Sequence, residues 1–267
     1  MDWLSHFGFH TTPFTPEIGV SQRFGLDTFD AALKGLLENI HMRFSAALIG
    51  ASGTGKSALL RAINDALPDA RFRVSYVKVT GLSKRDLCRE VATALGAKPA
   101  GSYPVLIRTI QDHMLSCTET DGLRPVILFD DAHEFRPDVL GILRVLSNFE
   151  MDSRLVVSFV LAGQTPLRTL LRRDHLEDVA RRLTYYATLR LLSRDEIGRY
   201  LTHRCTIAGA DTLPFDTPAL DAIYEVGRGN LRASDQLARV SLQIAADLDH
   251  PVVGTNHVVD ARKLLWP

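Results

Sequence analysis

The run from Gly50 to Ser57 reads Gly-Ala-Ser-Gly-Thr-Gly-Lys-Ser and has the residue types to bind phosphate groups. It matches the pattern G-x-x-x-x-G-K-[ST], in which glycines let successive backbone N–H groups face a chain of phosphates. Lys56 would reach the β- and γ-phosphates, and the Ser57 hydroxyl would coordinate magnesium. The pattern predicts a site for ATP and Mg²⁺ built from Gly50, Ala51, Ser52, Gly53, Thr54, Gly55, Lys56, Ser57 and Ala58.

A pair of acids, Asp130 and Asp131, follows the apolar run Val126 to Phe129. Such a run predicts a buried strand, and ligands of open α/β sheets bind outside the carboxyl ends of the strands. We expect Asp130 to hold the magnesium through water, together with Ser57, and Asp131 to orient or deprotonate the attacking water. The alternative is that these acids only terminate a strand.

Apolar strands alternate with helical patterns over the part of the chain that carries these residues. Strands are predicted at 45–49, 73–79, 126–129 and 155–162. Helices are predicted from about 26 to 40 and at 57–67, 83–95, 105–116 and 137–149. This order favours a parallel sheet covered by helices on both faces.

The strand signals stop at about residue 192, and only helices are predicted beyond it, at 193–208, 216–227, 231–248 and 254–265. The predicted fold is therefore α/β, a P-loop parallel sheet flanked by helices and followed by a small all-helical lid. We assign 26–192 to the nucleotide-binding domain and 193–267 to the lid. Residues 1–25, rich in aromatics and prolines, are expected to form an extension packed on the core of the nucleotide-binding domain.

The composition is that of an ordinary globular protein of 267 residues with a formal net charge of zero. A neutral balance removes the simplest argument for nucleic-acid binding, although a local basic stripe stays open. Three widely spaced cysteines argue against a disulfide framework or a zinc site. The sequence has no long apolar window and no signal-peptide pattern, so we expect a cytoplasmic protein without a membrane partner.

The phosphate loop, the acidic pair and a helical C-terminal unit together resemble the AAA+ ATPases, over nearly the whole chain. Leu161-Ala162-Gly163-Gln164 resembles the sensor-1 turn, which implies that Gln164 contacts the γ-phosphate or positions the water. Gly227 to Arg232 resembles sensor 2, which implies that Arg232 reaches the γ-phosphate from the lid. The alternatives are an ordinary turn for Gln164 and a solvated helix residue for Arg232.

Arginines gather before the lid, at Arg168, Arg172, Arg173, Arg181 and Arg182. The AAA+ resemblance implies that one of them enters the site of a neighbouring subunit as an arginine finger. Position favours Arg182 and then Arg181, with a solvated charge run as the alternative.

Asp131 departs from the AAA+ pattern, in which the acidic pair is Asp-Glu. Aspartate is one methylene shorter than glutamate, so its carboxylate needs a closer water or a bridging one. A misplacement of about 1 Å can cost on the order of a hundredfold in rate. We therefore hypothesise slow hydrolysis, suited to a switch rather than a motor and stimulated by a partner or DNA.

Within the AAA+ proteins, three segments resemble ExeA-like ATPases, a group that includes the transposition ATPases TniB and TnsC, with MuB more distant. The segments are Phe7 to Phe14 with Arg23-Phe24, Tyr76 to Asp86, and Arg262 to Pro267. The resemblance implies ATP-bound subunits that assemble as a ring or helical filament on double-stranded DNA and recruit a transposase, with hydrolysis driving disassembly. Non-specific contacts to DNA phosphates are assigned to Lys78, Lys84 and Arg85.

Two other functions stay open. One is an ExeA-like secretion ATPase; such proteins carry a transmembrane segment and a peptidoglycan-binding portion after the ATPase, and we expect neither here because the sequence ends just after the lid. The other is an ATP-dependent switch that binds protein partners without DNA. The neutral net charge and Asp131 favour that switch.

Overall fold

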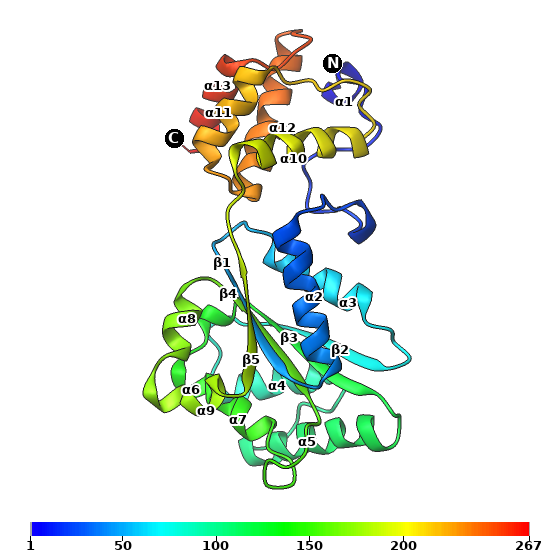
Figure 1. Cartoon of the computed structure of the whole chain (residues 1–267), viewed down its shortest axis with the longest axis vertical. Coiled ribbons are helices and arrows are strands. Elements are labelled where there is room, and N and C mark those ends of the chain that lie inside the picture. The colour runs from blue at the N-terminus through cyan, green and yellow to red at the C-terminus, as the bar shows by residue number, and fades with distance from the viewer. Residues whose placement is uncertain (1, 267) are drawn as a thin grey trace. The chain divides into compact units, whose positions relative to one another are not determined.

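The computed structural model describes residues 2–266, and their contacts divide the chain into two compact units (Figure 1). The α/β unit comprises Asp27–Ala51 and Lys56–Leu189. The helical unit comprises residues 2–26, 52–55 and 190–266. The tip of the glycine-rich loop is thus grouped with the helices, and the predicted boundaries after residues 25 and 192 fall within a few residues of these.

The α/β unit is built on one five-stranded parallel sheet with the strand order β2-β3-β4-β1-β5 (Figure 1). The strands are β1 (Ser45–Gly50), β2 (Phe72–Lys78), β3 (Arg124–Asp130), β4 (Ser158–Gly163) and β5 (Leu183–Leu189). β1 and β4 are buried at every position, as expected for central strands with helices on both faces. The predicted α/β fold class is confirmed.

β5 lies outside the predicted strands. It is an edge strand, so one side of it stays accessible and its residues alternate: Leu183, Ala187 and Leu189 are buried, while Thr184 is exposed. Strands of this sheet were predicted from unbroken apolar runs. An edge strand can have an alternating pattern instead, so β5 was missed. Its pairing with β1 places it beside the strand that leads into the glycine-rich loop.

Helices cover the sheet. α2 (Asp27–His41) and α3 (Lys56–Ala66) contact each other and β1. A separate hydrophobic cluster joins alternate strand residues to α4 (Lys84–Leu95), α5 (Tyr103–Glu119), α6 (Pro137–Leu140), α7 (Ile142–Leu146), α8 (Pro166–Leu171) and α9 (Glu177–Ala180). The single helix predicted at 137–149 is instead the two short helices α6 and α7, interrupted at Gly141.

The helical unit contains the four helices expected after residue 192. They are α10 (Arg194–Ile207), α11 (Thr217–Gly227), α12 (Leu231–Asp247) and α13 (Thr255–Leu265), preceded in sequence by the short α1 (Trp3–His6). Side chains cap the first three: Ser193 and Glu196 form a capping box on α10, Asp216 caps α11 and Asn230 caps α12. These caps explain why the predicted starts agree with the structure.

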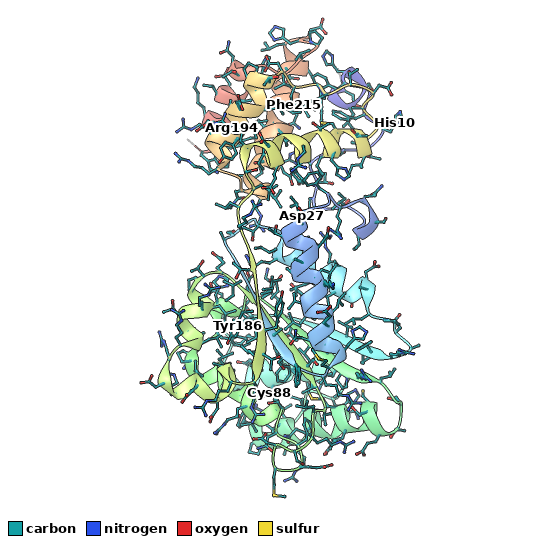
Figure 2. All side chains as sticks on the ribbon, in the orientation of Figure 1. His10, Asp27, Cys88, Tyr186, Arg194 and Phe215 are labelled. Atoms are coloured by element: carbon teal, nitrogen blue, oxygen red, sulfur yellow. The ribbon has the colours of Figure 1, made fainter. Side chains whose placement is uncertain are left out.

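The N-terminal segment packs in the helical unit, so its expected place on the α/β core is corrected; residue 1 lies outside the described part. Phe9 and Phe14 are buried in the hydrophobic cluster of α10 to α13. The Phe14 ring meets Phe215 edge-on, at 6.2 Å between ring centres (Phe215 is labelled in Figure 2). The physical reason is that so small a helical unit encloses little apolar surface on its own, and the aromatics complete its core.

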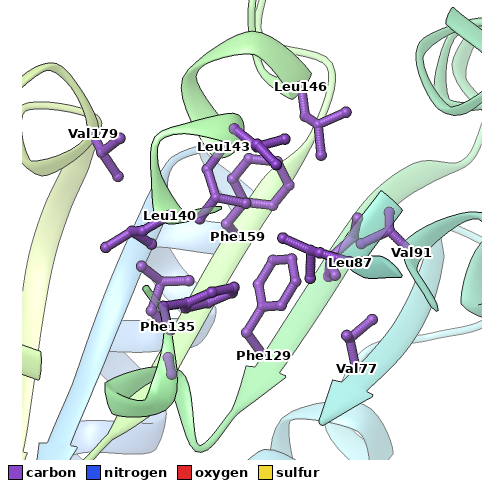
Figure 3. Close-up of a cluster of buried hydrophobic side chains, with 14 of the residues drawn as sticks. Val77, Leu87, Val91, Phe129, Phe135, Leu140, Leu143, Leu146, Phe159 and Val179 are labelled. Carbon is purple, nitrogen blue, oxygen red and sulfur yellow. The ribbon is translucent and has the colours of Figure 1, made fainter. Parts of the chain in front are cut away.

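One cluster of aromatic side chains fixes the end of β3. Phe129 is fully buried, and its ring centre lies 5.6 Å from that of Phe135 and 5.9 Å from that of Phe159 (Figure 3). Both contacts are edge-on, a favourable geometry for aromatic pairs. Because Phe129 directly precedes Asp130, this packing holds the carboxyl end of the strand, where the acids begin.

Candidate nucleotide site

The glycine-rich loop joins a strand to a helix as its pattern requires. β1 ends at Gly50 and α3 begins at Lys56. Gly53 and Gly55 adopt φ values of +73° and +94°, in the left-handed region that side chains disfavour. Glycine at these two positions therefore allows the backbone conformation of the loop.

Lys56 is held beside this loop by its own chain. Its ammonium donates to the carbonyl oxygens of Gly50 at 3.0 Å and Ala51 at 2.8 Å, and the side chain is buried. An ammonium group is a compact, freely rotating triple donor, so it can exchange these carbonyls for phosphate oxygens with little movement. This is the role predicted for Lys56.

Asp130 joins the loop to the sheet. Its buried carboxylate accepts a hydrogen bond from the Ser57 hydroxyl at 2.8 Å and another from the Tyr76 hydroxyl at 3.2 Å, both on Oδ2. Its Oδ1 accepts the backbone N–H of Asp131 at 2.9 Å. Magnesium prefers hard oxygen ligands, and the hydroxyl and carboxylate predicted to hold it are in direct contact. The donor set therefore fits a magnesium ion.

Two residues of β2 reach the acidic pair. Burial, followed by the nearby carboxylates of Asp130 and Asp131, raises the pKa of Tyr76 to about 12, so its hydroxyl stays protonated and donates at neutral pH. The Lys78 ammonium lies 4.0 Å from Asp131 Oδ2. Tyr76 was not predicted, and Lys78 was assigned to DNA. Tyr76 and Lys78 are two residues apart on β2 and therefore share one face of the sheet, and β2 pairs with β3. This spacing is the sequence signal that could have indicated both residues.

Asp131 lies at the surface end of this cluster. Its backbone has φ 54° and ψ 33°, a left-handed conformation that aspartate tolerates better than most residues. The side chain is about one-third exposed (36%), so water can reach its carboxylate. The predicted role of orienting or deprotonating that water stays a prediction.

Gln164 follows β4 and contacts a histidine that follows the acidic pair. Its Nε2 lies 2.8 Å from Nε2 of His133 in the 3-10 turn η2 (Ala132–Glu134). Gly163 lets the two turns approach, because a Cβ there would lie 2.9 Å from the backbone nitrogen of His133. The structure thus brings Gln164 to the turn that begins at Asp131, and its contact with the γ-phosphate or the water stays a prediction.

Residues 42–171 match the AAA domain family. The chain carries an AAA domain. It is also 32% identical over 185 residues to General secretion pathway protein A from Aeromonas hydrophila. That alignment covers 68% of this chain and 33% of the relative, so the chain spans about a third of the relative's length.

Solved structures share the fold of the AAA domain and of the helices that follow it. Cdc6p from Pyrobaculum aerophilum is similar with a TM-score of 0.76 and 18% identity, over 94% of this chain and 70% of that one. The ORC1 protein of Aeropyrum pernix, in complex with DNA, has a TM-score of 0.72 and 17% identity, over 96% and 70%. At this identity the likeness shows the fold alone, which is that of AAA+ proteins.

The two arginines favoured as fingers of the AAA domain are both in ion pairs within the chain. Arg182 Nη2 donates to both carboxylate oxygens of Asp152 at 2.8 Å, and Arg181 donates to Glu177 at 2.6 Å. Arg168 donates to the Thr188 hydroxyl at 3.1 Å. Their role toward a second subunit stays a prediction.

Asn230 is a residue of the helical unit that the sequence analysis missed. Its Oδ1 accepts the N–H of Ala233 to cap α12, and its Nδ2 donates to the Ser52 carbonyl at 2.6 Å, within the same contact group. An asparagine before a helix can be predicted as a helix cap from the sequence. Its contact with the loop tip could not be predicted in that way. Arg232, two residues along, is exposed, and its sensor-2 role stays a prediction.

The remaining residues assigned to DNA lie near the start of α4. Lys84 is exposed, and Arg85 Nη2 donates to the Gly101 carbonyl at 2.9 Å. Their contact with DNA stays a prediction. Among the described residues, no helix combines the length and the apolar character needed to span a bilayer.

Proposed function

We propose that this chain binds ATP with magnesium at the AAA domain and hydrolyses it slowly, so that the bound nucleotide switches its association with partners. The observation that carries this is the 2.8 Å contact between Ser57 and Asp130. This contact joins the residue after the phosphate-loop lysine to the last residue of β3, and Asp131 follows β3 directly. The groups proposed to bind ATP and the candidate base are therefore close together.

In the proposed reaction, the oxygen of a water molecule attacks the γ-phosphorus as the bond to the β–γ bridging oxygen breaks. ADP leaves with that electron pair, and Asp131 accepts a proton from the water. Lys56 would neutralise phosphate charge from the loop. Ser57 and Asp130 would hold magnesium, which neutralises charge on the β- and γ-phosphates.

The curated relative supports the alternative function better than transposition. Its name places it in a general secretion pathway, and it is 32% identical to this chain over 185 residues. We therefore propose that the chain acts as the ATPase unit of an assembly of that kind, with self-association through the arginine-rich segment. Regulation of a transposase on double-stranded DNA has less support, since Lys78 lies beside Asp131 and Arg85 is bonded to Gly101.

Three variants test the catalytic proposal by ATP binding and phosphate release. Lys56→Ala should lose most ATP affinity, whereas Asp131→Asn should still bind ATP and hydrolyse it about 10²–10⁴-fold more slowly. Lys34→Ala, at an exposed lysine of α2, is the matched control and should behave as wild type. An Asp131→Asn protein with wild-type turnover would refute the assignment of the base.

The same proteins separate the two biological readings. We expect no ATP-dependent association with labelled random duplex DNA at low salt, measured by fluorescence anisotropy, and ATP-dependent self-association in sedimentation. Association with DNA that needs ATP and weakens steeply with salt would favour the transposition reading instead.

A further inference from the structure

The contact between His133 and Gln164 has a feature that neither the resemblance nor the loop pattern accounts for. The His133 side chain is nine-tenths buried, with 10% exposed, and its Nδ1 atom is buried without a hydrogen-bond partner in the described part of the chain. Its Nε2 faces the Gln164 side chain at 2.8 Å and the Glu134 carboxylate at 3.4 Å.

These surroundings decide where the neutral ring carries its proton. Nδ1 is buried without a partner in either tautomer, at a cost of about 1–3 kcal/mol each way, so the groups that face Nε2 decide between them. A proton on Nε2 has the Glu134 carboxylate beside it and can also be accepted by the Gln164 amide oxygen. The geometry therefore favours the tautomer protonated on Nε2.

That tautomer fixes the orientation of the Gln164 amide. The oxygen and nitrogen of an amide have nearly the same shape, so the hydrogen-bond network assigns them. The structure places the amide nitrogen of Gln164 toward His133 Nε2, and a donating Nε2–H requires the flipped amide, with its oxygen facing His133 and its NH₂ group turned away. Gln164 then presents a donor, rather than an acceptor, to any other group at the carboxyl end of the sheet.

We propose that His133 is a positioning residue for ATP hydrolysis, which rests on the function proposed above. It holds the Gln164 amide with the NH₂ group free to donate to the γ-phosphate or to the attacking water. Gly163 supports this arrangement by allowing β4 to approach the backbone of His133. A residue merely filling space in η2 would need no particular ring nitrogen at this place.

Substitutions at His133 separate positioning from packing through steady-state hydrolysis. His133→Leu should lower kcat about 10- to 100-fold and leave KM for ATP within about twofold, since the lost interaction acts in the transition state. His133→Gln should recover most of the rate, because its amide nitrogen reaches the place of Nε2. His133→Asn should not, because its shorter amide reaches only the place of Nδ1.

A change at the other partner gives an independent readout. Gln164→Glu keeps an acceptor for His133 but offers no donor, so its rate should fall as far as that of His133→Leu. His175→Leu, at an exposed histidine of the same unit, is the matched control. Wild-type kcat in both His133→Leu and Gln164→Glu would overturn the proposal.

The tautomer can be measured without turnover, by long-range ¹H–¹⁵N correlation on ¹⁵N-histidine-labelled protein, with His133→Gln used to assign the signal. A neutral ring protonated on Nε2 is expected, and a ring protonated on Nδ1 would overturn the proposal even if a leucine variant failed to fold. A wild type that binds ATP without hydrolysing it would instead contradict the proposed function. In that case the measured tautomer still decides how His133 orients Gln164.

Discussion

Replacing Arg204 by methionine tests how the N-terminal segment is held in the helical unit. Arg204 is buried, with its side chain 7% exposed. Its guanidinium donates to the Tyr200 hydroxyl at 2.8 Å and to the Thr15 carbonyl at 2.7 Å, and it lies 3.6 Å from the Asp235 carboxylate. Methionine keeps most of the volume, so Arg204→Met removes the charge and the donors rather than opening a cavity.

The structure sets the size of the effect. Removing one partner of a buried ion pair costs about 3–5 kcal/mol, because the other charge remains buried without compensation. Burial raises the pKa of Asp235 to about 6, although Arg204 and the Tyr200 hydroxyl oppose the rise. Asp235 is therefore ionised in wild type at pH 7.5, and the variant must leave it either charged without a partner or forced to take up a proton, both of which cost stability. At pH 5 it is protonated, and the cost should fall to the lost hydrogen bonds, about 1–3 kcal/mol.

Urea unfolding followed by tryptophan fluorescence measures this effect in the helical unit. The chain has two tryptophans, Trp3 and Trp266, and contacts group both with that unit. The unfolding midpoint of Arg204→Met should be lower than that of wild type, and the difference should shrink between pH 7.5 and pH 5. A free energy of unfolding within about 0.5 kcal/mol of wild type at pH 7.5, the range of ordinary surface substitutions, would refute the reasoning.

Two further predictions concern buried titratable groups. The pKa of Asp235 rises from 3.8 to about 6 on folding, so wild type should lose about 3 kcal/mol of stability as the pH rises from about 4 to above 6; urea unfolding of Asp235→Asn should lack this loss. Burial also raises the pKa of Cys88 to about 11 and of Cys205 to about 12, and that of Cys117 in the same direction. A disulfide reagent at pH 8 should therefore modify none of the three thiols in the native protein and all of them in urea, and fast labelling of a native thiol would contradict the burial.

The phosphate loop is the part of the site that the sequence predicts best, because its residues are consecutive. The path from β1 through Gly53 and Gly55 into α3 is a local property of the chain, so a pattern of residue types describes it completely. Asp130 was predictable for a related reason, since it ends an apolar run. Neither prediction required knowing which strands are neighbours.

Contacts between strands could not be predicted in the same way. Lys78 pairs in register with Asp130 only because β2 lies next to β3, and the sequence analysis did not derive strand order. The same holds for His133 and Gln164, which meet where β3 and β4 end side by side. The N-terminal segment posed a similar difficulty, because its aromatics show what must be buried but not which core receives them.

The residue type at position 131 follows from the backbone as well as from chemistry. Compared with the glutamate of the AAA+ pattern, Asp131 is shorter by one methylene, which is expected to lower the rate. In the structure its φ is 54°, in the left-handed region where aspartate is enriched because its short side chain bonds locally. A glutamate here would gain reach toward water but would adopt this backbone less readily. The same left-handed turn begins η2, which carries His133 to Gln164. Asp131 therefore has less reach than a glutamate but suits the turn that carries His133, and the rate of hydrolysis stays a prediction.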